Sequence, residues 1–328
     1  MFDGLPLAVN ALITLISLVV LVVAADFAIS RAVHVAQHYR VSPLIIGTTL
    51  VAMSTSLAEL VVNLAATFSG ASTAIVIGNI LGSNMANIGL GLGVAAILTP
   101  LITVTLVIER EIVLYFAVTA LMTGLALSGA ITRIDGIILV ICFVIIMYLV
   151  YQYARRSQEE ATEEDSEERG QGVSPLLIGQ VIAALVLLVI AAEVLVEAVG
   201  AIARSAGVSE YIIGVTIVGI GTSLPELATS IQAARRGQVD LVLGNVFGSN
   251  VFNICIALGL PAVVRAVPIP KTAVQDLYFL NILGIGVVFI LLGEYPFLGK
   301  NKVIGAWGGA VIAASYIGYL VFKIAFAA

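Results

Sequence analysis

Long apolar runs recur along the whole chain and are separated by short polar connections. A helix of about 20 apolar residues spans roughly 30 Å of hydrocarbon, whereas the strands of a membrane barrel alternate polar and apolar residues in short segments. The pattern therefore predicts an all-α integral membrane protein with ten transmembrane helices. Their expected centres lie near residues 17, 55, 85, 119, 142, 187, 222, 252, 283 and 313.

The second half of the chain repeats the first half. GTTLVAMSTSLAEL (47–60) is matched 167 residues later by GVTIVGIGTSLPEL (214–227). GNILGSNMAN (78–87) is matched 166 residues later by GNVFGSNVFN (244–253). A register held over this length indicates a duplicated unit and not a chance similarity.

Each copy holds five of the predicted helices. We expect a first repeat over residues 1–153, a linker over 154–173 and a second repeat over 174–328. Because five is odd, the second copy enters the membrane from the opposite side. Inverted repeats of this kind are typical of transporters whose site lies near the bilayer midplane.

Composition agrees with a membrane protein, because 60% of the residues are hydrophobic and only 11% are charged. The net charge of −5 reflects the linker, where the stretch 157–169 alone carries seven acids and is expected to be a solvated connection. Ten of the 15 Lys and Arg residues fall on the side of the linker. Since positive loops remain in the cytoplasm, we expect a plasma-membrane protein with both termini outside and the linker in the cytoplasm.

Polar side chains inside the apolar helices occupy equivalent positions in the two repeats. The second helix of each repeat carries Thr and Glu four residues apart, and the third carries Ser and Asn four apart, which places each pair on one helix face. These eight side chains are Thr55, Glu59, Ser83, Asn87, Thr222, Glu226, Ser249 and Asn253.

The same helices are expected to be broken. Pro225 removes a backbone donor from helix 7. The glycine pairs Gly78/Gly82 and Gly244/Gly248 loosen helices 3 and 8 and allow close backbone approach. We therefore predict broken helices 2, 3, 7 and 8 around a central ion site. The backbone carbonyls freed there would add oxygen ligands, because unwound backbone in a membrane must line a cavity or be buried in protein.

The two glutamates predict what the site binds. A lone acid at the bilayer centre costs at least about 2.5–3.5 kcal/mol, and no Lys or Arg lies in the adjoining predicted helices. The compensating charge must come from one divalent cation, two monovalent cations or two protons. Hard oxygen donors without Cys or His argue against zinc and copper, and flexible oxygen ligation suits calcium better than magnesium. A protein with an empty site would switch slowly between the two sides of the membrane, because two carboxylates would be left without compensating charge. Each switch therefore needs a bound cation, which predicts antiport.

Other polar residues have more than one interpretation. Asp26 and Glu193, on the first helix of each repeat, are interpreted as structural hydrogen-bonding groups that tie helices together. His34 and His38 are four residues apart and could bind a metal or sense pH. Their position in a connection rich in Arg favours a solvated face instead.

Two stretches resemble the signature repeats of the cation/calcium exchanger superfamily, and within it the prokaryotic sodium/calcium exchangers: GTSLPEL (221–227) and GNVFGSNVFNI (244–254). The resemblance spans essentially the whole chain. It implies a secondary active antiporter that exchanges calcium for sodium by alternating access, with the first helix of each repeat sliding past the rest. It implies no enzyme activity and no cofactor. Its expected partners are Ca²⁺, Na⁺ and the lipid bilayer, without nucleic acid or an obligate protein partner.

The resemblance also implies a ligand set. Glu59 and Glu226 would be shared calcium ligands, helped by Thr55 and Thr222. The other implied ligands or supporting groups are the backbone carbonyls of Ala52 and Gly219, the hydroxyls of Ser56, Ser83, Ser223 and Ser249, and the central pair Asn87 and Asn253.

The sequence departs from the family pattern at four positions. Ser54 and Ala58 replace the usual glycine and proline of the first motif, and Asn63 stands where the second copy has the more usual Ser230. Asn253 stands where many sodium/calcium exchangers have Asp. The last change leaves two formal charges in place of three. It favours a cycle with fewer coupling ions and keeps open a proton-coupled exchanger of calcium or another divalent cation.

Three other classes of membrane protein fit the sequence less well. A channel would need an open polar path in place of broken symmetric repeats. An intramembrane hydrolase would need a nucleophile–base pair or a metal held by His, and the predicted helices hold neither. A purely structural protein would not need duplicated acids at the midplane.

Overall fold

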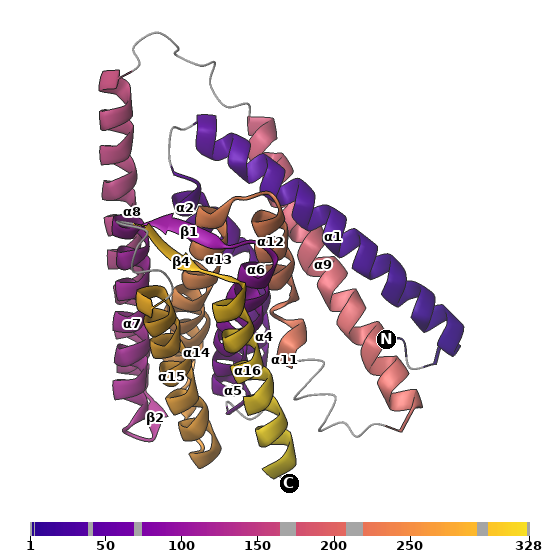
Figure 1. Cartoon of the computed structure of the whole chain (residues 1–328). Coiled ribbons are helices and arrows are strands. Elements are labelled where there is room, and N and C mark those ends of the chain that lie inside the picture. The colour runs from indigo at the N-terminus through magenta and orange to yellow at the C-terminus, as the bar shows by residue number, and fades with distance from the viewer. Residues whose placement is uncertain are drawn as a thin grey trace.

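The protein is an all-helical bundle with several membrane-crossing helices (Figure 1). The computed structural model describes residues 2, 4–38, 42–68, 74–164, 175–207, 219–293 and 301–326. Among these residues, eight helices are long and apolar enough to span a membrane, and a ninth apolar helix, Glu111–Ala126, is shorter. The predicted seventh helix is described only from Gly219 onward. The chain is a multi-pass membrane protein, and the count of ten helices stays a prediction.

Two long helices, α1 (Leu7–His38) and α9 (Pro175–Ser205), pack along each other and run obliquely across the edge of the bundle (Figure 1). They share a hydrophobic cluster of their own, which includes Leu21, Ala25 and Leu188 and is separate from the main core. Their remaining apolar faces are exposed, as expected of helices surrounded by lipid. The pair therefore forms a unit beside the main bundle.

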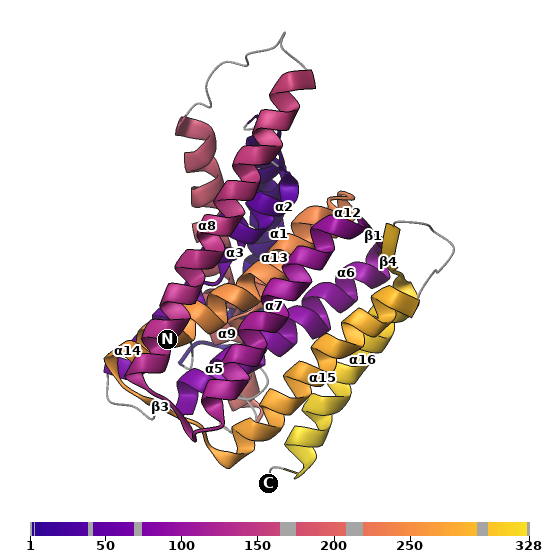
Figure 2. The same ribbon diagram turned by 90° about the vertical axis from the view of Figure 1, so that its left-hand side faces the viewer.

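The main bundle is built from the remaining helices of both halves. In the first half they are α2 (Pro43–Ile46), η1 (Gly47–Val51), α3 (Ala52–Thr55), α4 (Leu57–Phe68), α5 (Ala74–Ala86), η2 (Asn87–Leu92), α6 (Gly93–Leu98), α7 (Thr105–Ala126) and α8 (Arg133–Glu164). In the second half they are α11 (Gly219–Gly221), α12 (Leu224–Arg235), α13 (Val239–Phe252), η4 (Asn253–Leu258), α14 (Gly259–Val264), α15 (Lys271–Gly293) and α16 (Ala306–Phe326). Figure 2 shows α7, α15 and α16 running side by side.

The second helix of each half is broken at the same repeat position. Ser56 separates α3 from α4 with φ −77° and ψ 3°, and Ser223 precedes α12 with φ −90° and ψ 4°. Pro225 lies in the first turn after the second break, where a missing N–H costs little. Ala58 lies at the equivalent position, so the first break forms without proline. The Thr55 hydroxyl bonds there to the carbonyls of its own preceding turn.

The third helix of each half is continuous, which corrects the prediction that helices 3 and 8 are broken. Each widens into a π-helical segment, η2 or η4, that begins at Asn87 or Asn253. Such segments are rare and frequently mark functional sites. Widening keeps the backbone hydrogen-bonded in the membrane, whereas a break would leave groups to be satisfied elsewhere.

Glycines bring α13 against α2 and η1. A Cβ on Gly244 would lie 2.5 Å from the carbonyl oxygen of Leu44, and one on Gly248 would lie 2.7 Å from that of Thr48. This confirms the close approach predicted for the second glycine pair. At the equivalent Gly78 and Gly82, no described atom comes that close.

Two short antiparallel ribbons join the halves outside the helices. β1 (Leu101–Val104) pairs with β4 (Asn301–Ile304), and β2 (Ala130–Ile131) pairs with β3 (Val267–Pro268). The ribbons lie at opposite ends of the bundle (Figures 1 and 2). Each ribbon links a connection of the first half to one of the second half, so the halves are tied at both ends.

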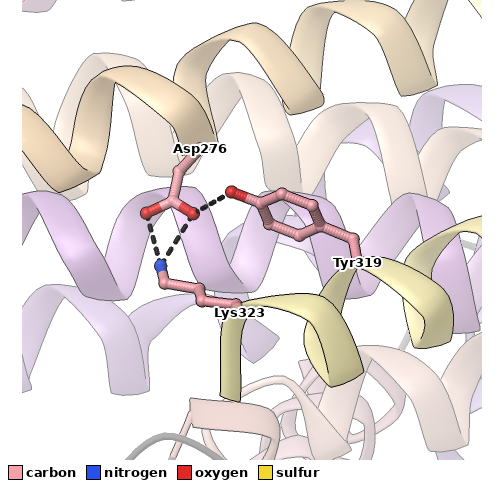
Figure 3. A network of polar contacts seen from close by, with 3 residues as sticks. All are labelled: Asp276, Tyr319 and Lys323. Carbon is pink, nitrogen blue, oxygen red and sulfur yellow. Dashed lines mark hydrogen bonds and ion pairs between the residues drawn. The ribbon is translucent and has the colours of Figure 1, made fainter. Parts of the chain in front are cut away.

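Two acids in the helices are neutralised by a basic residue. Asp276 of α15 accepts hydrogen bonds from Lys323 (2.7 Å) and from the hydroxyl of Tyr319 (2.6 Å), both on α16 (Figure 3). Asp26 of α1 accepts two hydrogen bonds of 2.8 Å from Arg236, at the end of α12. The second pair ties the α1–α9 unit to the main bundle and confirms a helix-tying role for Asp26.

We expect Gly248→Ala to lower the melting temperature of the purified protein in detergent. The added methyl group would overlap the backbone of Thr48, and overpacking of this kind costs roughly 1–3 kcal/mol. The control is Gly318→Ala on α16, where no described atom lies within 4 Å of the new Cβ. Equal melting temperatures for the two variants would contradict the proposed close packing.

Candidate cation-binding site

The predicted site residues meet where the breaks at Ser56 and Ser223 face the π-helical segments η2 and η4. Of the ten predicted side chains, nine are buried and Thr222 is half-buried. The buried nine are Thr55, Ser56, Glu59, Ser83, Asn87, Ser223, Glu226, Ser249 and Asn253. A group this polar at the centre of an apolar bundle requires internal partners or a ligand.

Each carboxylate is approached by serines from both halves. Ser56 of the first half donates a hydrogen bond of 2.7 Å to Oε1 of Glu226. The equivalent Ser223 lies next to Glu59, together with Ser83. Ser249 and Thr55 lie next to Glu226. The first half thus supplies a serine to the acid of the second half and the second half supplies one to the acid of the first.

The predicted backbone ligands differ in what the structure places around them. The carbonyl of Ala52 is at the site, because Ser249 lies 3.5 Å from it and points its hydroxyl toward it. Gly219 opens α11, four residues before the break at Ser223. Thr222 lies in the break itself, 3.4 Å from Ser83 and from Oδ1 of Asn79.

Four asparagines connect the third helices of the two halves. Asn87 donates to Oδ1 of Asn250 (3.0 Å), and Asn253 donates to Oδ1 of Asn84 (3.1 Å). Sequence reasoning selected Asn87 and Asn253 and missed Asn84 and Asn250. The missed pair was visible as the duplicated asparagine of GSNMAN and GSNVFN, but spacing along one helix does not reveal a partner on another.

A further shell of amides supports the broken helices. Asn245 donates to the backbone carbonyl of Glu226 (3.1 Å) and to the hydroxyls of Thr229 and Ser230. Asn63 donates to the carbonyl of Ala257 (2.9 Å) and accepts from Asn79. These bonds fix the helices that carry the carboxylates.

Several buried oxygens at the site accept no hydrogen bond from the described residues. They are both carboxylate oxygens of Glu59, Oε2 of Glu226, and the amide oxygens of Asn87 and Asn253. The two carboxylates are close enough to interact electrostatically, and no described Lys or Arg is paired with either. Buried acceptors without donors are rare in folded proteins. The donor set therefore fits a hard cation, for which calcium takes 6–8 oxygens in flexible geometry.

The described residues hold no cluster of three or more His, Cys, Asp or Glu that could bind a metal. The charge of the site therefore comes from two carboxylates, and the rest of its ligands are neutral oxygens. His34 and His38 are both exposed on the last turns of α1.

The surroundings of Glu193 differ from those of its repeat equivalent Asp26. Its side chain is exposed, and with Glu197 it lines a cavity of about 300 Å³ between α9, α4 and the start of α12. The cavity also reaches Thr222 and Pro225, so it touches the edge of the site. The predicted helix-tying role is therefore not found for Glu193 in the described part of the chain.

Comparisons with known proteins agree on one family. The sequence profile of the Sodium/calcium exchanger protein family matches residues 9–152 and 176–325. The chain is 31% identical to the sodium/calcium exchanger MaX1 of Methanosarcina acetivorans, covering 96% of this chain and 98% of that protein. It is 33% identical to the inner membrane protein YrbG of Escherichia coli, covering 91% and 93%. A solved structure of the sodium-calcium exchanger NCX_Mj superposes with a TM-score of 0.81 at 29% identity, covering 98% and 99%.

We expect Glu59→Gln to raise the melting temperature of the ion-free protein by a few degrees, or roughly 1–2 kcal/mol for a chain of this size. The change removes one of two neighbouring buried acids and their mutual repulsion. Thermal unfolding in detergent with chelator and without sodium measures the shift. Glu193→Gln is the control, because that acid faces a cavity. A lower melting temperature for Glu59→Gln would show that the pair does not destabilise the empty site.

Proposed function

The chain belongs to the sodium/calcium exchanger protein family, and we propose that it exchanges calcium for sodium across the cell membrane by alternating access. One observation carries the proposal. Glu59 and Glu226 are fully buried in the membrane, close together and without a basic partner among the described residues, while Asp26 and Asp276 each have one. The missing positive charge is that of the transported ion.

Charge balance explains why the protein exchanges ions and does not leak them. One Ca²⁺ or two Na⁺ neutralise two carboxylates. Either filled site can pass through the closed intermediate of the transport cycle, in which water is excluded. An empty site would have to carry two uncompensated charges through that intermediate, and each costs at least about 2.5–3.5 kcal/mol in the membrane. The return step therefore needs a second cation, which is antiport.

The proposed ligands follow from the oxygens that lack donors. Glu59 and Glu226 contribute the charge, and Asn87 and Asn253 contribute neutral oxygens. The supporting ligands are Thr55, Thr222, Ser56, Ser83, Ser223, Ser249 and the carbonyls of Ala52 and Gly219. All of them belong to one chain, so the proposed exchange requires the two ions and the bilayer and no protein partner.

The cavity beside α9 is the proposed route to the site. Glu193 and Glu197 line it, and Thr222 forms part of its wall next to Ser83. Carboxylates at this depth are tolerated where they face water. The equivalent acid on α1, Asp26, is bound by Arg236 instead. The structure therefore supports a state that is open along α9 and closed along α1, with the α1–α9 unit as the part that moves.

The proposed topology is two inverted five-helix repeats joined by the linker 154–173. The chain ends, at α1 and α16, lie at one end of the molecule, whereas the helix ends that flank the linker lie at the other (Figure 1). This arrangement supports termini on one side and the linker on the other. With the Lys and Arg bias, the linker side is assigned to the cytoplasm.

A proton-coupled exchanger of calcium or another divalent cation is the second candidate. Asn253 favours it, because an amide in place of the carboxylate common in the family leaves only two charges to neutralise. Two protons satisfy those charges as well as two sodium ions do. Three sodium ions or an added potassium would leave the filled site with a net positive charge.

We expect an outward sodium gradient to drive calcium-45 uptake into proteoliposomes, and a pH gradient of equal size to drive none. Exchange of two Na⁺ for one Ca²⁺ moves no net charge, so clamping the membrane potential with valinomycin should leave the rate unchanged. Glu226→Gln should abolish uptake while the protein remains folded. Uptake with the pH gradient alone would favour the second candidate. A steep voltage dependence would require a third coupling ion.

We expect Cys at position 193 to react with charged, membrane-impermeant methanethiosulfonate reagents. The experiment uses Glu193→Cys in a background with Cys142→Ser and Cys255→Ser. A cationic reagent should react several-fold faster than an anionic one, because the site acids Glu59 and Glu226 attract it. Val186→Cys is the control, since Val186 is exposed on the same helix among apolar residues and should stay unmodified. If neither Glu193→Cys nor Val186→Cys were modified by the reagents, the route along α9 would be contradicted.

A further inference from the structure

Four buried asparagines lie at the contact between the third helices of the two halves. Asn84 and Asn250 are fully buried, and each bonds to one of the proposed ligands Asn87 and Asn253. We propose that Asn84 and Asn250 are positioning residues that turn the ligand amides so that only oxygen faces the cation. This inference rests on the proposed function, because it concerns how that site presents its neutral ligands.

The side-chain amides of Asn84 and Asn250 are oriented by backbone carbonyl groups. Nδ2 of Asn84 lies 3.4 Å from the carbonyl oxygen of Asn250, and Nδ2 of Asn250 lies 3.4 Å from the carbonyl oxygen of Asn84. A carbonyl oxygen only accepts hydrogen bonds, so each of these amides must turn its NH₂ group toward it. The opposite face of each amide, which carries Oδ1, is then left for the ligand asparagine.

The orientation of Asn84 and Asn250 in turn determines the orientation of the ligand amides. Because Oδ1 of Asn84 can only accept, Asn253 must present its NH₂ group to Asn84, at 3.1 Å. The same holds for Asn87 and Oδ1 of Asn250, at 3.0 Å. Both ligand amides thus have a donor already engaged, and their own Oδ1 atoms are the ones left buried without a partner.

The arrangement is crossed between the halves. Asn84 of the first half orients the ligand of the second half, and Asn250 of the second half orients the ligand of the first half. Neither half could orient its own ligand asparagine without the other half. The site therefore presents two oxygens only when both third helices are in contact.

The same contact specifies a neutral ligand at position 253. An ionised aspartate there would place a carboxylate oxygen against Oδ1 of Asn84, so two acceptors would face each other without a proton. Asn84 is therefore also expected to determine the charge of the site. It keeps the formal charge at two, which is the basis for the proposed exchange of two sodium ions for one calcium.

Double-mutant cycles test the crossed pattern. Equilibrium binding of calcium-45 and of sodium-22 is measured on the purified full-length protein in detergent, with the ion-free melting temperature as the check of folding. Asn84→Ala and Asn253→Ala should each weaken binding about five- to tenfold. The double variant should bind about as weakly as Asn253→Ala alone. Asn84→Ala combined with Asn87→Ala should instead multiply the two losses. Asn250 should couple to Asn87 in the same way and not to Asn253.

A second pair of variants keeps the test decisive if alanine disturbs folding. Asn84→Ser alone should weaken calcium binding, because the ligand amide loses its fixed acceptor. In the Asn253→Asp background the same change should strengthen binding, because a serine hydroxyl can donate to the new carboxylate. Asn253→Asp without it should not bind calcium more tightly than the wild type, despite its extra charge.

The outcomes separate this inference from the function on which it rests. Wild-type protein that binds an ion, with additive losses in every cycle or with the same effect of Asn84→Ser in both backgrounds, would overturn the positioning role alone. A folded wild-type protein that binds neither calcium nor sodium would overturn both the proposed function and the inference. Crossed coupling and the reversed effect of Asn84→Ser would support both.

Discussion

The structure depends on one constraint, which is the burial of two neighbouring carboxylates in a membrane without a positive partner among the described residues. Glu59 and Glu226 are as buried as any leucine of the core. An unpaired buried charge is among the most costly features that a fold can contain. It is tolerated where a ligand supplies the missing charge, and the features around the pair are those that a cation needs: oxygens without donors, a nearby cavity and a helix pair outside the main bundle.

The backbone meets this constraint by two different means. The second helix of each half is broken at Ser56 or Ser223, which brings a serine to the carboxylate of the other half. The third helix is widened at Asn87 or Asn253 and remains continuous. A break turns a helix end toward the proposed ion site, whereas a π-helical segment turns a side chain toward that site without exposing backbone to lipid.

Much of the proposed site could be predicted from the sequence because its residues recur at equivalent positions in the two halves of the chain. Equivalence of Glu59 with Glu226 and of Asn87 with Asn253 selects residues that composition alone would not. The contacts between helices could not be predicted in this way. Asn84 bonds to Asn253, 169 positions away, and Asp26 bonds to Arg236, 210 positions away. Periodicity indicates which residues share a helix face, but it does not indicate which face of another helix packs against them. It also did not distinguish a widened helix from a broken one, since glycines are compatible with both.

The departures from internal symmetry indicate how the two halves differ in function. Asp26 and Glu193 occupy equivalent positions on α1 and α9, but within the described part of the chain Asp26 alone of the two has a basic partner, Arg236 directly after α12. A symmetric pair of acids would leave both sides of the site equally polar and equally accessible to water. In the proposed cycle, neutralising Asp26 and leaving Glu193 in a cavity would close one side of the site and let the other side admit a cation. In the opposite state of the proposed cycle the α1–α9 unit would have to release Asp26 from Arg236, so this ion pair would set part of the free-energy difference between the two states. Ion pairs as exposed as this one contribute about 0–1 kcal/mol, small enough for the charge of the bound cation to decide which state prevails.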